Sequence, residues 1–95
     1  MKSDPKTAVW DTMIGKEIVV DTCCNFIYLG KLVEVDEHFV VLQDVDVHDR
    51  TDGSSTNERY VMETRKEGIR KNRNRASVRM SLVVSVSLLE DVVTY

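Results

Sequence analysis

Basic side chains are concentrated in one stretch of this 95-residue sequence. Asparagines alternate with these charges at Asn72 and Asn74, and no aromatic residue lies among them. Such a composition suits contact with phosphates better than recognition of base edges. An alternative is a solvated hairpin face that pairs with acids of a neighbouring subunit. Residues 65–79 hold one acid, Glu67, and these bases: Arg65, Lys66, Arg70, Lys71, Arg73, Arg75 and Arg79. The candidate acids for the alternative are Asp44, Asp46, Asp49 and Asp52.

A second polar group alternates along a predicted strand. Asp44, Asp46 and His48 share one face, and Asp49 and Asp52 follow them. Carboxylates and an imidazole at this spacing could hold a divalent cation. No second ligand cluster supports them, and the glycine of a calcium loop is missing at its required offset. A polar strand face turned to solvent is the better interpretation, so we expect no metal and no other cofactor.

The histidines and cysteines do not predict catalysis. Cys23 and Cys24 are adjacent in a predicted hairpin turn, with no helix N-terminus to lower a thiol pKa. Adjacent cysteines rarely form a disulfide, because the required Cα separation strains the backbone. Neither histidine has an obvious nucleophile beside it, and no glycine-rich phosphate loop is present. We expect free thiols in a reducing compartment, no enzyme activity and no small-molecule substrate.

The length predicts a single domain that spans residues 1–95. A chain this small buries a modest fraction of its surface and often depends on a partner chain. Its net charge of -3 argues against a simple polycation that coats nucleic acid. No apolar run approaches the ~20 residues of a membrane span, and no secretory signal is visible. We therefore expect a cytoplasmic protein that has no membrane contact.

The pattern of apolar residues predicts a short helix followed by five strands. The helix covers about residues 5–13 within an N-terminal segment 1–14, capped by Ser3 or Asp4. Its apolar residues would cross an open end of a barrel: Ala8, Val9, Trp10 and Met13. Strands are expected at about residues 16–22, 26–35, 39–47 and 76–80, and a fifth follows Leu82. Residues 49–75 form an elaborated loop and hairpin segment, in which residues 60–64 lengthen a hairpin as strand.

Two details of these strands shape the expected barrel. Gly30 lies inside the second strand, where a missing Cβ permits a sharp bend. A strongly bent strand between shorter ones begins the closure of a small barrel. The third strand is expected to turn one set of residues to one face, with Gln43 interrupting it: Phe39, Val41, Val45 and Val47.

The stretch 14–45 resembles the first sequence motif of the Sm-like (LSm) proteins. The matching residues are Gly15, Val19, Gly30, Leu32, Asp36, Phe39, Leu42 and Asp44. Their spacing G-x-L-x-x-h-D-x-x-h combines a bend glycine, a core leucine and a turn aspartate. The shorter second motif would be residues 78–83, with Met80 where the family usually has glycine. The resemblance implies an all-β fold with a short N-terminal helix, a small strongly bent five-stranded open barrel of the Sm-like/SH3-like type.

The resemblance also implies an oligomer. Sm-like proteins form rings of six or seven subunits, so the expected partner is the chain itself, as a homo-hexamer or heptamer. An open barrel leaves unpaired backbone groups on its edge strands. Pairing the fourth strand of one copy with the fifth of the next satisfies them in a head-to-tail contact that can close.

The same resemblance assigns residues to an RNA site on the inner rim of the ring. The matching positions are Asp36, His38, Val40 and Arg79. Asp36 would orient the turn, His38 would stack on a base, and Arg79 would stack or contact phosphate. The family typically has asparagine at the position of Val40, and valine cannot hydrogen-bond a base. Losing that pair removes about 1–3 kcal/mol of base discrimination.

Two functions follow from these expectations. The first is a ring that binds single-stranded RNA with weak or altered base specificity. Its contacts would come from the rim residues and from phosphate-binding Arg70, Lys71, Arg73 and Arg75. The second is a structural or protein-binding homo-oligomer that no longer binds RNA. A steep salt dependence of RNA binding would separate the first from the second.

Overall fold

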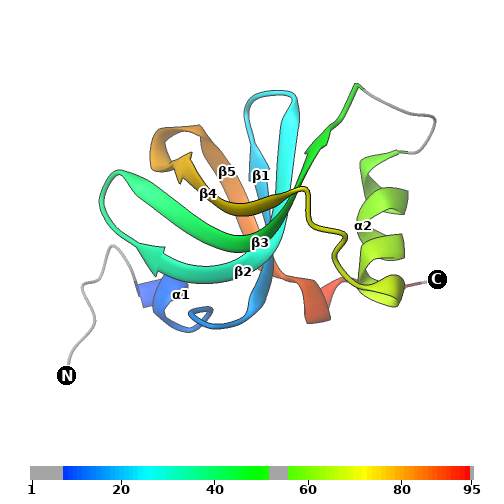
Figure 1. Cartoon of the computed structure of the whole chain (residues 1–95), viewed down its shortest axis with the longest axis horizontal. Helices are drawn as coiled ribbons and strands as arrows, with labels where there is room; N and C mark the ends of the chain where they lie inside the picture. The colour runs from blue at the N-terminus through cyan, green and yellow to red at the C-terminus, as the bar shows by residue number, and fades with distance from the viewer. Residues whose placement is uncertain (1–7, 52–55, 95) are drawn as a thin grey trace.

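The computed structural model describes residues 8–51 and 56–94. Its helices and strands are α1 (Ala8–Asp11), β1 (Glu17–Thr22), β2 (Phe26–Val35), β3 (Phe39–Asp49), α2 (Asn57–Glu67), β4 (Arg73–Arg79) and β5 (Val83–Leu88). Single turns of 3-10 helix, η1 (Met80–Leu82) and η2 (Leu89–Asp91), precede and follow β5. The strands form one antiparallel sheet in the order β4-β3-β2-β1-β5 (Figure 1). Among the described residues, no helix is long and apolar enough to cross a membrane.

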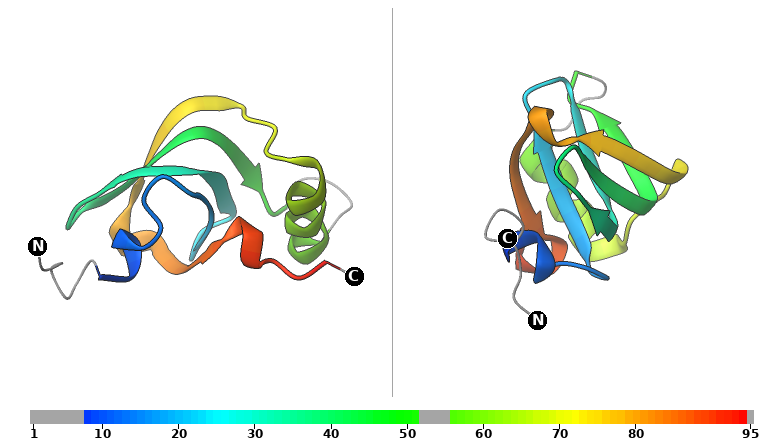
Figure 2. Two further views of the ribbon diagram at one scale, coloured as in Figure 1. Left: turned by 90° about the horizontal axis from the view of Figure 1, so that it is seen from below. Right: turned by 90° about the vertical axis from the view of Figure 1, so that its left-hand side faces the viewer.

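The paired strands of the sheet curve strongly (Figure 2). In β2, a Cβ added to Gly30 would come 3.2 Å from the carbonyl oxygen of Gln43 and from Cγ2 of Val45. The pairing register shifts at the same place, between Leu29 and Lys31. Because the two backbones approach so closely, only a residue without a side chain fits without displacement. This close approach supports the bend predicted at Gly30.

The inner face of the sheet encloses the larger apolar core. β1 contributes Ile18 and Val20, and β3 contributes Val40, Leu42 and Val45, all with no exposed surface. The core is closed at one end by α1, where Trp10 is buried and Met13 packs beside it, as expected. The prediction was wrong for Ala8 and Val9, which are both exposed, Val9 at 61%. Residues 5–7 of the predicted helix and its capping residues lie outside the described residues.

The predicted shared face of the third strand is confirmed for Val45 and Val47, which both pack in the larger core, and was wrong for Phe39 and Val41, which lie before a change of phase. Val40 and Leu42 point into the core, whereas Phe39 remains 39% exposed. The reason is a bulge, since Gln43 opposes Lys31 and Asp46 opposes Leu29, which leaves two residues of β3 opposite Gly30. Asp44 at this bulge has a φ of 53°, a conformation that aspartate tolerates better than most residues. The alternation of side chains therefore restarts after Asp44.

The strand predicted at residues 60–64 was also wrong, because this part of the elaborated segment is the helix α2. Thr56 caps its first turn by accepting a hydrogen bond from Arg59 N at 3.2 Å. Gly68, with a φ of 93°, ends it and donates to the carbonyl of Thr64 at 2.8 Å. Tyrosine, valine and methionine at 60–62 favour strand locally. The two caps, together with the packing of Tyr60 and Val61 on the sheet, outweigh that preference.

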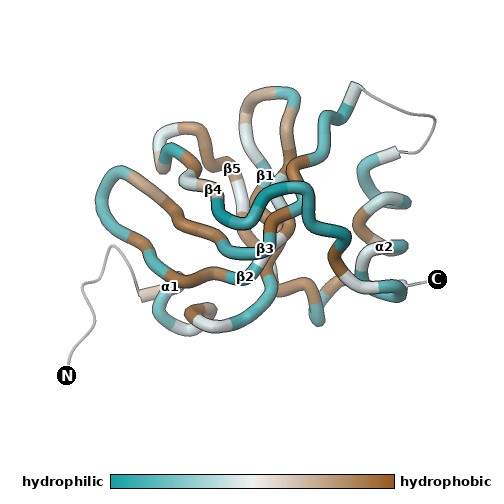
Figure 3. Tube along the Cα trace, in the orientation of Figure 1, coloured by the Kyte–Doolittle hydropathy of each residue, from teal (hydrophilic) through white to brown (hydrophobic). Residues whose placement is uncertain are grey.

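Helix α2 covers an apolar patch on the outer face of the sheet. Val19 of β1 and Ile27 and Leu29 of β2 form this patch, and each is no more than 2% exposed. The side chains of Tyr60 and Val61 pack against it from α2. Brown segments in β1 and β2 beside α2 show the contrast with the hydrophilic strand β4 (Figure 3). β1 is therefore buried on both faces, which is why its sequence is apolar at three successive positions, 18–20.

Candidate nucleic-acid interface

The turn between β2 and β3 is held rigid by Asp36. Its carboxylate accepts hydrogen bonds from the backbone amides of His38 at 2.8 Å and Phe39 at 2.7 Å. These two bonds, the His38 amide first, hold the pKa of the Asp36 carboxyl below its usual value. The predicted orienting function of Asp36 is therefore matched by its geometry. The turn presents the imidazole of His38 outward, in a fixed backbone frame.

His38 and Arg79 lie at one pocket although 41 positions separate them in sequence, from 38 to 79. Antiparallel pairing places Arg79 of β4 opposite Phe39 of β3. The amide of Met80 then donates to the carbonyl of His38 at 2.7 Å, which ties η1 to the turn. The pocket has a volume of about 470 Å³ and is lined by Glu37, His38, Phe39, Arg79, Met80 and Ser81. Within the described residues, neither the imidazole of His38 nor the guanidinium of Arg79 forms a hydrogen bond or an ion pair.

Phe39 and Met80 are pocket residues that the sequence did not reveal as such. Phe39 was expected to share a face with three valines, but its ring is partly exposed and lines the pocket together with His38. Met80 is half-buried where glycine is usual in the resembled motif. Two apolar side chains beside an imidazole and a guanidinium make surfaces on which a flat ring can stack. The position of Phe39 directly after the turn residue His38 is the sequence signal that could have identified it as a pocket residue.

Val40 is placed differently from the other rim candidates. Its side chain has no exposed surface and packs in the core with Leu42 and Val78. It pairs with Val78 across β3 and β4. A side chain in this position cannot touch a ligand in the pocket, so Val40 supports the pocket from behind.

Most of the basic segment is partnered within the chain. Lys71 forms an ion pair with Asp44 at 3.2 Å, Arg70 with Glu67 at 3.1 Å, and Arg75 with Glu34 at 3.8 Å. All six side chains are more than half exposed, so these pairs contribute little to stability and can exchange for other anions. The acids that pair with these bases belong to the same chain. Of these acids, only Asp44 was among the residues predicted to pair with the basic segment of a neighbouring subunit.

Arg75 and Arg79 lie on the same side of β4 as Ser77, away from the core residue Val78, whereas Arg73 begins the strand opposite Val45, beyond the bulge of β3. All four of these polar side chains are exposed. Six strand residues correspond to about 20 Å, the distance from Arg73 to Arg79 along the strand. Within the described part of the chain, Arg73 and Arg79 form no ion pair. The basic residues of β4 are therefore spaced along the strand toward the pocket of His38 and Arg79.

The acidic and histidine residues of β3 do not converge on a metal site. The Asp46 side chain is 4% exposed, accepts from Tyr60 Oη on one oxygen, and accepts from Asn72 Nδ2 at 3.2 Å on the other. His48 stacks on Tyr60 with ring centroids 3.6 Å apart. The expectation of a solvent-facing polar strand was wrong for Asp46, because α2 covers it. These residues fasten α2 to the sheet. This function could not be predicted without knowing the position of α2.

Asn72 completes this fastening. Its side-chain oxygen accepts from the amide of Val47 at 3.0 Å, and its nitrogen donates to the carbonyl of the same residue at 3.0 Å. The side-chain amide thus pairs with β3 as a strand neighbour would. Burial first, and then the hydrogen bond to Asp46, raise the pKa of Tyr60 well above its usual value. Both observations describe a structural network rather than a ligand site.

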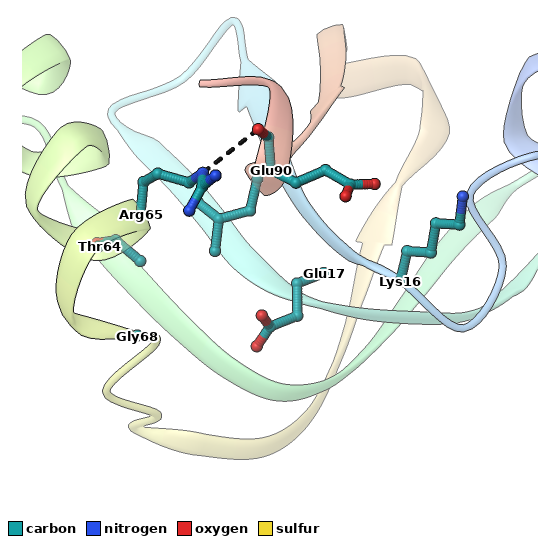
Figure 4. Close-up of a pocket in the computed structure, with 7 residues that line it drawn as sticks. Lys16, Glu17, Thr64, Arg65, Gly68 and Glu90 are labelled. Atoms are coloured by element: carbon teal, nitrogen blue, oxygen red, sulfur yellow. Dashed lines mark hydrogen bonds between the residues drawn. The ribbon is translucent and has the colours of Figure 1, made fainter. Parts of the chain in front are cut away.

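A second concavity lies between the start of β1, the end of α2 and η2 (Figure 4). Its volume is about 380 Å³, and it carries the cations Lys16 and Arg65 and the anions Glu17 and Glu90. Arg65 Nε donates to the carbonyl of Glu90 at 3.3 Å. This concavity shares no lining residue with the pocket of His38 and Arg79. Mixed charge on an open surface selects no ligand class, so we assign it no function.

Comparison with known proteins identifies the architecture. No family model matches the sequence, and no curated protein matches it. Among solved structures, an Sm protein of Pyrococcus abyssii in complex with a uridine heptamer is 20% identical, with a TM-score of 0.60, covering 90% of this chain and 99% of that one. A heptameric archaeal Sm protein is 19% identical, with a TM-score of 0.54, covering 85% and 96%.

A third neighbour comes from a different setting. A chain of the NatC complex bound to CoA is 22% identical, with a TM-score of 0.57, covering 97% of this chain and 94% of its own. Identities this low establish the fold alone. The expected resemblance to Sm-like proteins and the predicted bent five-stranded fold are confirmed at that level: this chain has the Sm fold.

Proposed function

We propose that this protein is a non-catalytic, ring-forming Sm-like protein that binds single-stranded RNA at the pocket of His38 and Arg79. The observation that carries the proposal is the convergence at one open pocket of an imidazole and a guanidinium that form no hydrogen bond or ion pair among the described residues. Asp36 fixes the turn before binding, which lowers the entropic cost of ordering it. One of the structural neighbours, the Pyrococcus abyssii protein, was solved with a uridine heptamer.

Base specificity at this pocket is expected to be weak. A base can stack on His38 or Phe39 irrespective of its identity, because every base has a π-face. Val40 is buried and apolar, so it offers no hydrogen bond to a base edge. Glu37 and Ser81 are the remaining polar side chains of the lining, and both are exposed. Stacking and phosphate contact without an edge-reading amide give affinity with little discrimination.

The path of the RNA follows from the row of arginines on β4. From Arg79 at the pocket, phosphates can continue along β4 to Arg75 and Arg73, which are both exposed. Arg75 would exchange the exposed carboxylate of Glu34 for phosphate. Lys71 and Arg70 lie just before this row and can exchange their acids in the same way.

The ring is proposed from the edges of the sheet. β4 and β5 are its two outer strands, and Val84 of β5 is 68% exposed. Antiparallel pairing of these edges between copies satisfies their free backbone groups. It also brings the basic start of β4, at Arg73, beside the acidic turn after β5, at Glu90 and Asp91. The opposite charges of Arg73 in one copy and of Glu90 and Asp91 in the next favour antiparallel pairing of these strands over parallel pairing.

The competing function is a protein-binding oligomer that does not bind RNA. It is favoured by one specific observation, that a chain of the same fold occurs in the NatC complex. Binding of fluorescent oligo-U and oligo-A at two salt concentrations separates the two functions. The proposal predicts similar binding of both oligomers and a logarithmic slope near -0.7 per phosphate contacted. Absence of binding to either oligomer at low salt would favour the protein-binding function.

A further inference from the structure

A cross-strand row of polar side chains lies on the face of the sheet that is turned away from the larger core. Lys31 of β2 lies opposite Gln43 of β3, and Gln43 lies opposite Arg75 of β4. Directly opposed residues of antiparallel strands share one face of a sheet. Their chain neighbours Leu32 and Leu42 point into the larger core, so the row points outward. All three side chains of the row are exposed.

The middle of this cross-strand row is an amide that has no partner among the described residues. Within the same part of the chain, Gln43 forms no side-chain hydrogen bond and Lys31 forms no ion pair. Arg75 is in its exposed pair with Glu34 at 3.8 Å, which a phosphate can replace. The row ends at an acid, since Glu17 of β1 lies opposite Lys31. An available amide between two cations is therefore the binding feature of this face.

The cross-strand row is continuous with the pocket of His38 and Arg79. In the pairing of β3 with β4, Gln43 lies opposite Arg75 and Phe39 lies opposite Arg79. The two pairs are four positions apart on each strand, which corresponds to about 13 Å along the sheet. Because four positions complete two steps of the strand alternation, both pairs lie on the same face. An RNA strand that leaves the pocket along β4 therefore passes over Gln43.

We propose that Gln43 distinguishes RNA from DNA by hydrogen-bonding a ribose 2′-hydroxyl, while Lys31 and Arg75 hold the phosphates on either side. This inference rests on the proposed RNA-binding function. One ribose separates successive phosphates, so the order cation, amide, cation matches phosphate, ribose, phosphate. Opposed residues lie about 4.5–5.5 Å apart at Cβ, and the long basic side chains adjust the remaining spacing. The amide donates and accepts, as the 2′-hydroxyl does.

The sugar is a better partner for Gln43 than a base edge. An amide reads a base through two hydrogen bonds when the base lies edge-on to it, whereas bases are proposed to stack on His38 and Phe39 in the pocket. Cations on both sides of the amide hold the backbone of the RNA against the sheet, rather than its bases. Discrimination by Gln43 therefore concerns the sugar and leaves the weak base preference unchanged.

The test compares the binding of fluorescent oligo-U and oligo-dU of equal length, which differ only in the sugar, to the full-length protein. Wild type should bind oligo-U more tightly. Gln43→Met keeps the side-chain length and removes the amide, so it should reduce this preference by about 2- to 10-fold, the factor that one hydrogen bond contributes. Lys31→Met should weaken both oligomers equally and lower the salt slope. Asn74→Leu, which changes an exposed amide outside the row, should bind both as the wild type does.

Three results would overturn this inference while the proposed function stands, because oligo-U still binds in each. One is equal affinity of the wild type for oligo-U and oligo-dU. Another is a Gln43→Met variant that keeps the wild-type preference for oligo-U. The third is a Gln43→Met variant that changes the preference between oligo-U and oligo-A, since Gln43 would then read a base.

Absence of oligo-U binding by the wild type at low salt would overturn the proposed function and this inference together. The three variants change exposed side chains, so their circular dichroism and melting temperature should match the wild type. Matching values exclude misfolding as the cause of a changed preference.

Discussion

A phenolic hydroxyl, that of Tyr60, fastens helix α2 to the sheet. Tyr60 donates from its Oη to the carboxylate of Asp46, which is 4% exposed, and its ring stacks on His48 at 3.6 Å. The substitution Tyr60→Phe removes the donor and preserves the ring and the stacking. Asp46 is then left with the hydrogen bond from Asn72 at 3.2 Å as its remaining side-chain contact.

The expected loss follows from the kind of hydrogen bond that is removed. A hydrogen bond to a charged group contributes about 1.5–3 kcal/mol, and a buried acceptor left partly unsatisfied loses the upper part of that range. For a domain of this size each kcal/mol corresponds to about 4–8 °C in melting temperature. Tyr60→Phe should therefore lower the free energy of unfolding by about 2 kcal/mol and the melting temperature by about 8–16 °C.

Thermal and urea unfolding at one fixed protein concentration measure this loss, since assembly makes stability depend on concentration. Tyr28→Phe is the matched control, because no hydrogen bond of the Tyr28 hydroxyl is found among the described residues. Wild type should also lose stability above pH about 10, the unfolded pKa of tyrosine, because folding raises the pKa of Tyr60. Equal stability of the two variants would refute the assignment of Tyr60 as the fastening of α2.

Three further changes have distinct expected outcomes. Gly30→Ala should destabilise the protein by about 1–2 kcal/mol in urea unfolding, because its methyl group would lie 3.2 Å from Gln43 O, and an unchanged midpoint would contradict the close approach. Asp36→Ala should weaken RNA binding by loosening the turn, and its loss of stability relative to wild type at neutral pH should disappear as pH falls below about 4, since the depressed pKa of Asp36 makes its stabilising contribution present above that pH and lost on acidification. Arg73→Ala should reduce the salt slope of RNA binding by about one contact without altering base preference, and an unchanged slope would remove Arg73 from the RNA path.

The sequence predicts most of the sheet because local patterns determine it. The alternation in β5 and the bend glycine of β2 act within a few residues of where they lie. The phase of β3 could not be predicted, because the bulge at Asp44 depends on the approach of Gly30 from another strand. The valine-rich sequence of β3 does not indicate whether a bulge adds an extra residue and so changes which side chains face the core.

Helix α2 shows a second limit. Tyr60, Val61 and their neighbours favour strand by propensity, while Thr56 and Gly68 are start and stop signals of a helix. The apolar outer face of β1 and β2 decides between them, and it is visible only once the sheet is assembled. Tertiary contact overrides local preference here.

The candidate site was predicted in part. The proximity of His38 and Arg79 came from the resemblance, and the register that pairs Phe39 with Arg79 places both at one pocket. The burial of Val40 could not be anticipated, since the predicted phase of β3 turned it outward. The pairing of Lys71 with Asp44 likewise depends on where the elaborated segment returns to the sheet.

The most direct test of the central claim is RNA binding by the double variant His38→Ala/Arg79→Ala. Arg59→Ala is its charge-matched control, since Arg59 lies on α2 in an exposed pair with Glu63, and both variants remove one positive charge at pH 7. Fluorescence anisotropy with oligo-U and oligo-A at low salt compares them with the wild type. The proposed site predicts that the double variant loses binding to both oligomers while Arg59→Ala binds as the wild type does. Retained binding by the double variant would place the RNA elsewhere and contradict the proposed pocket.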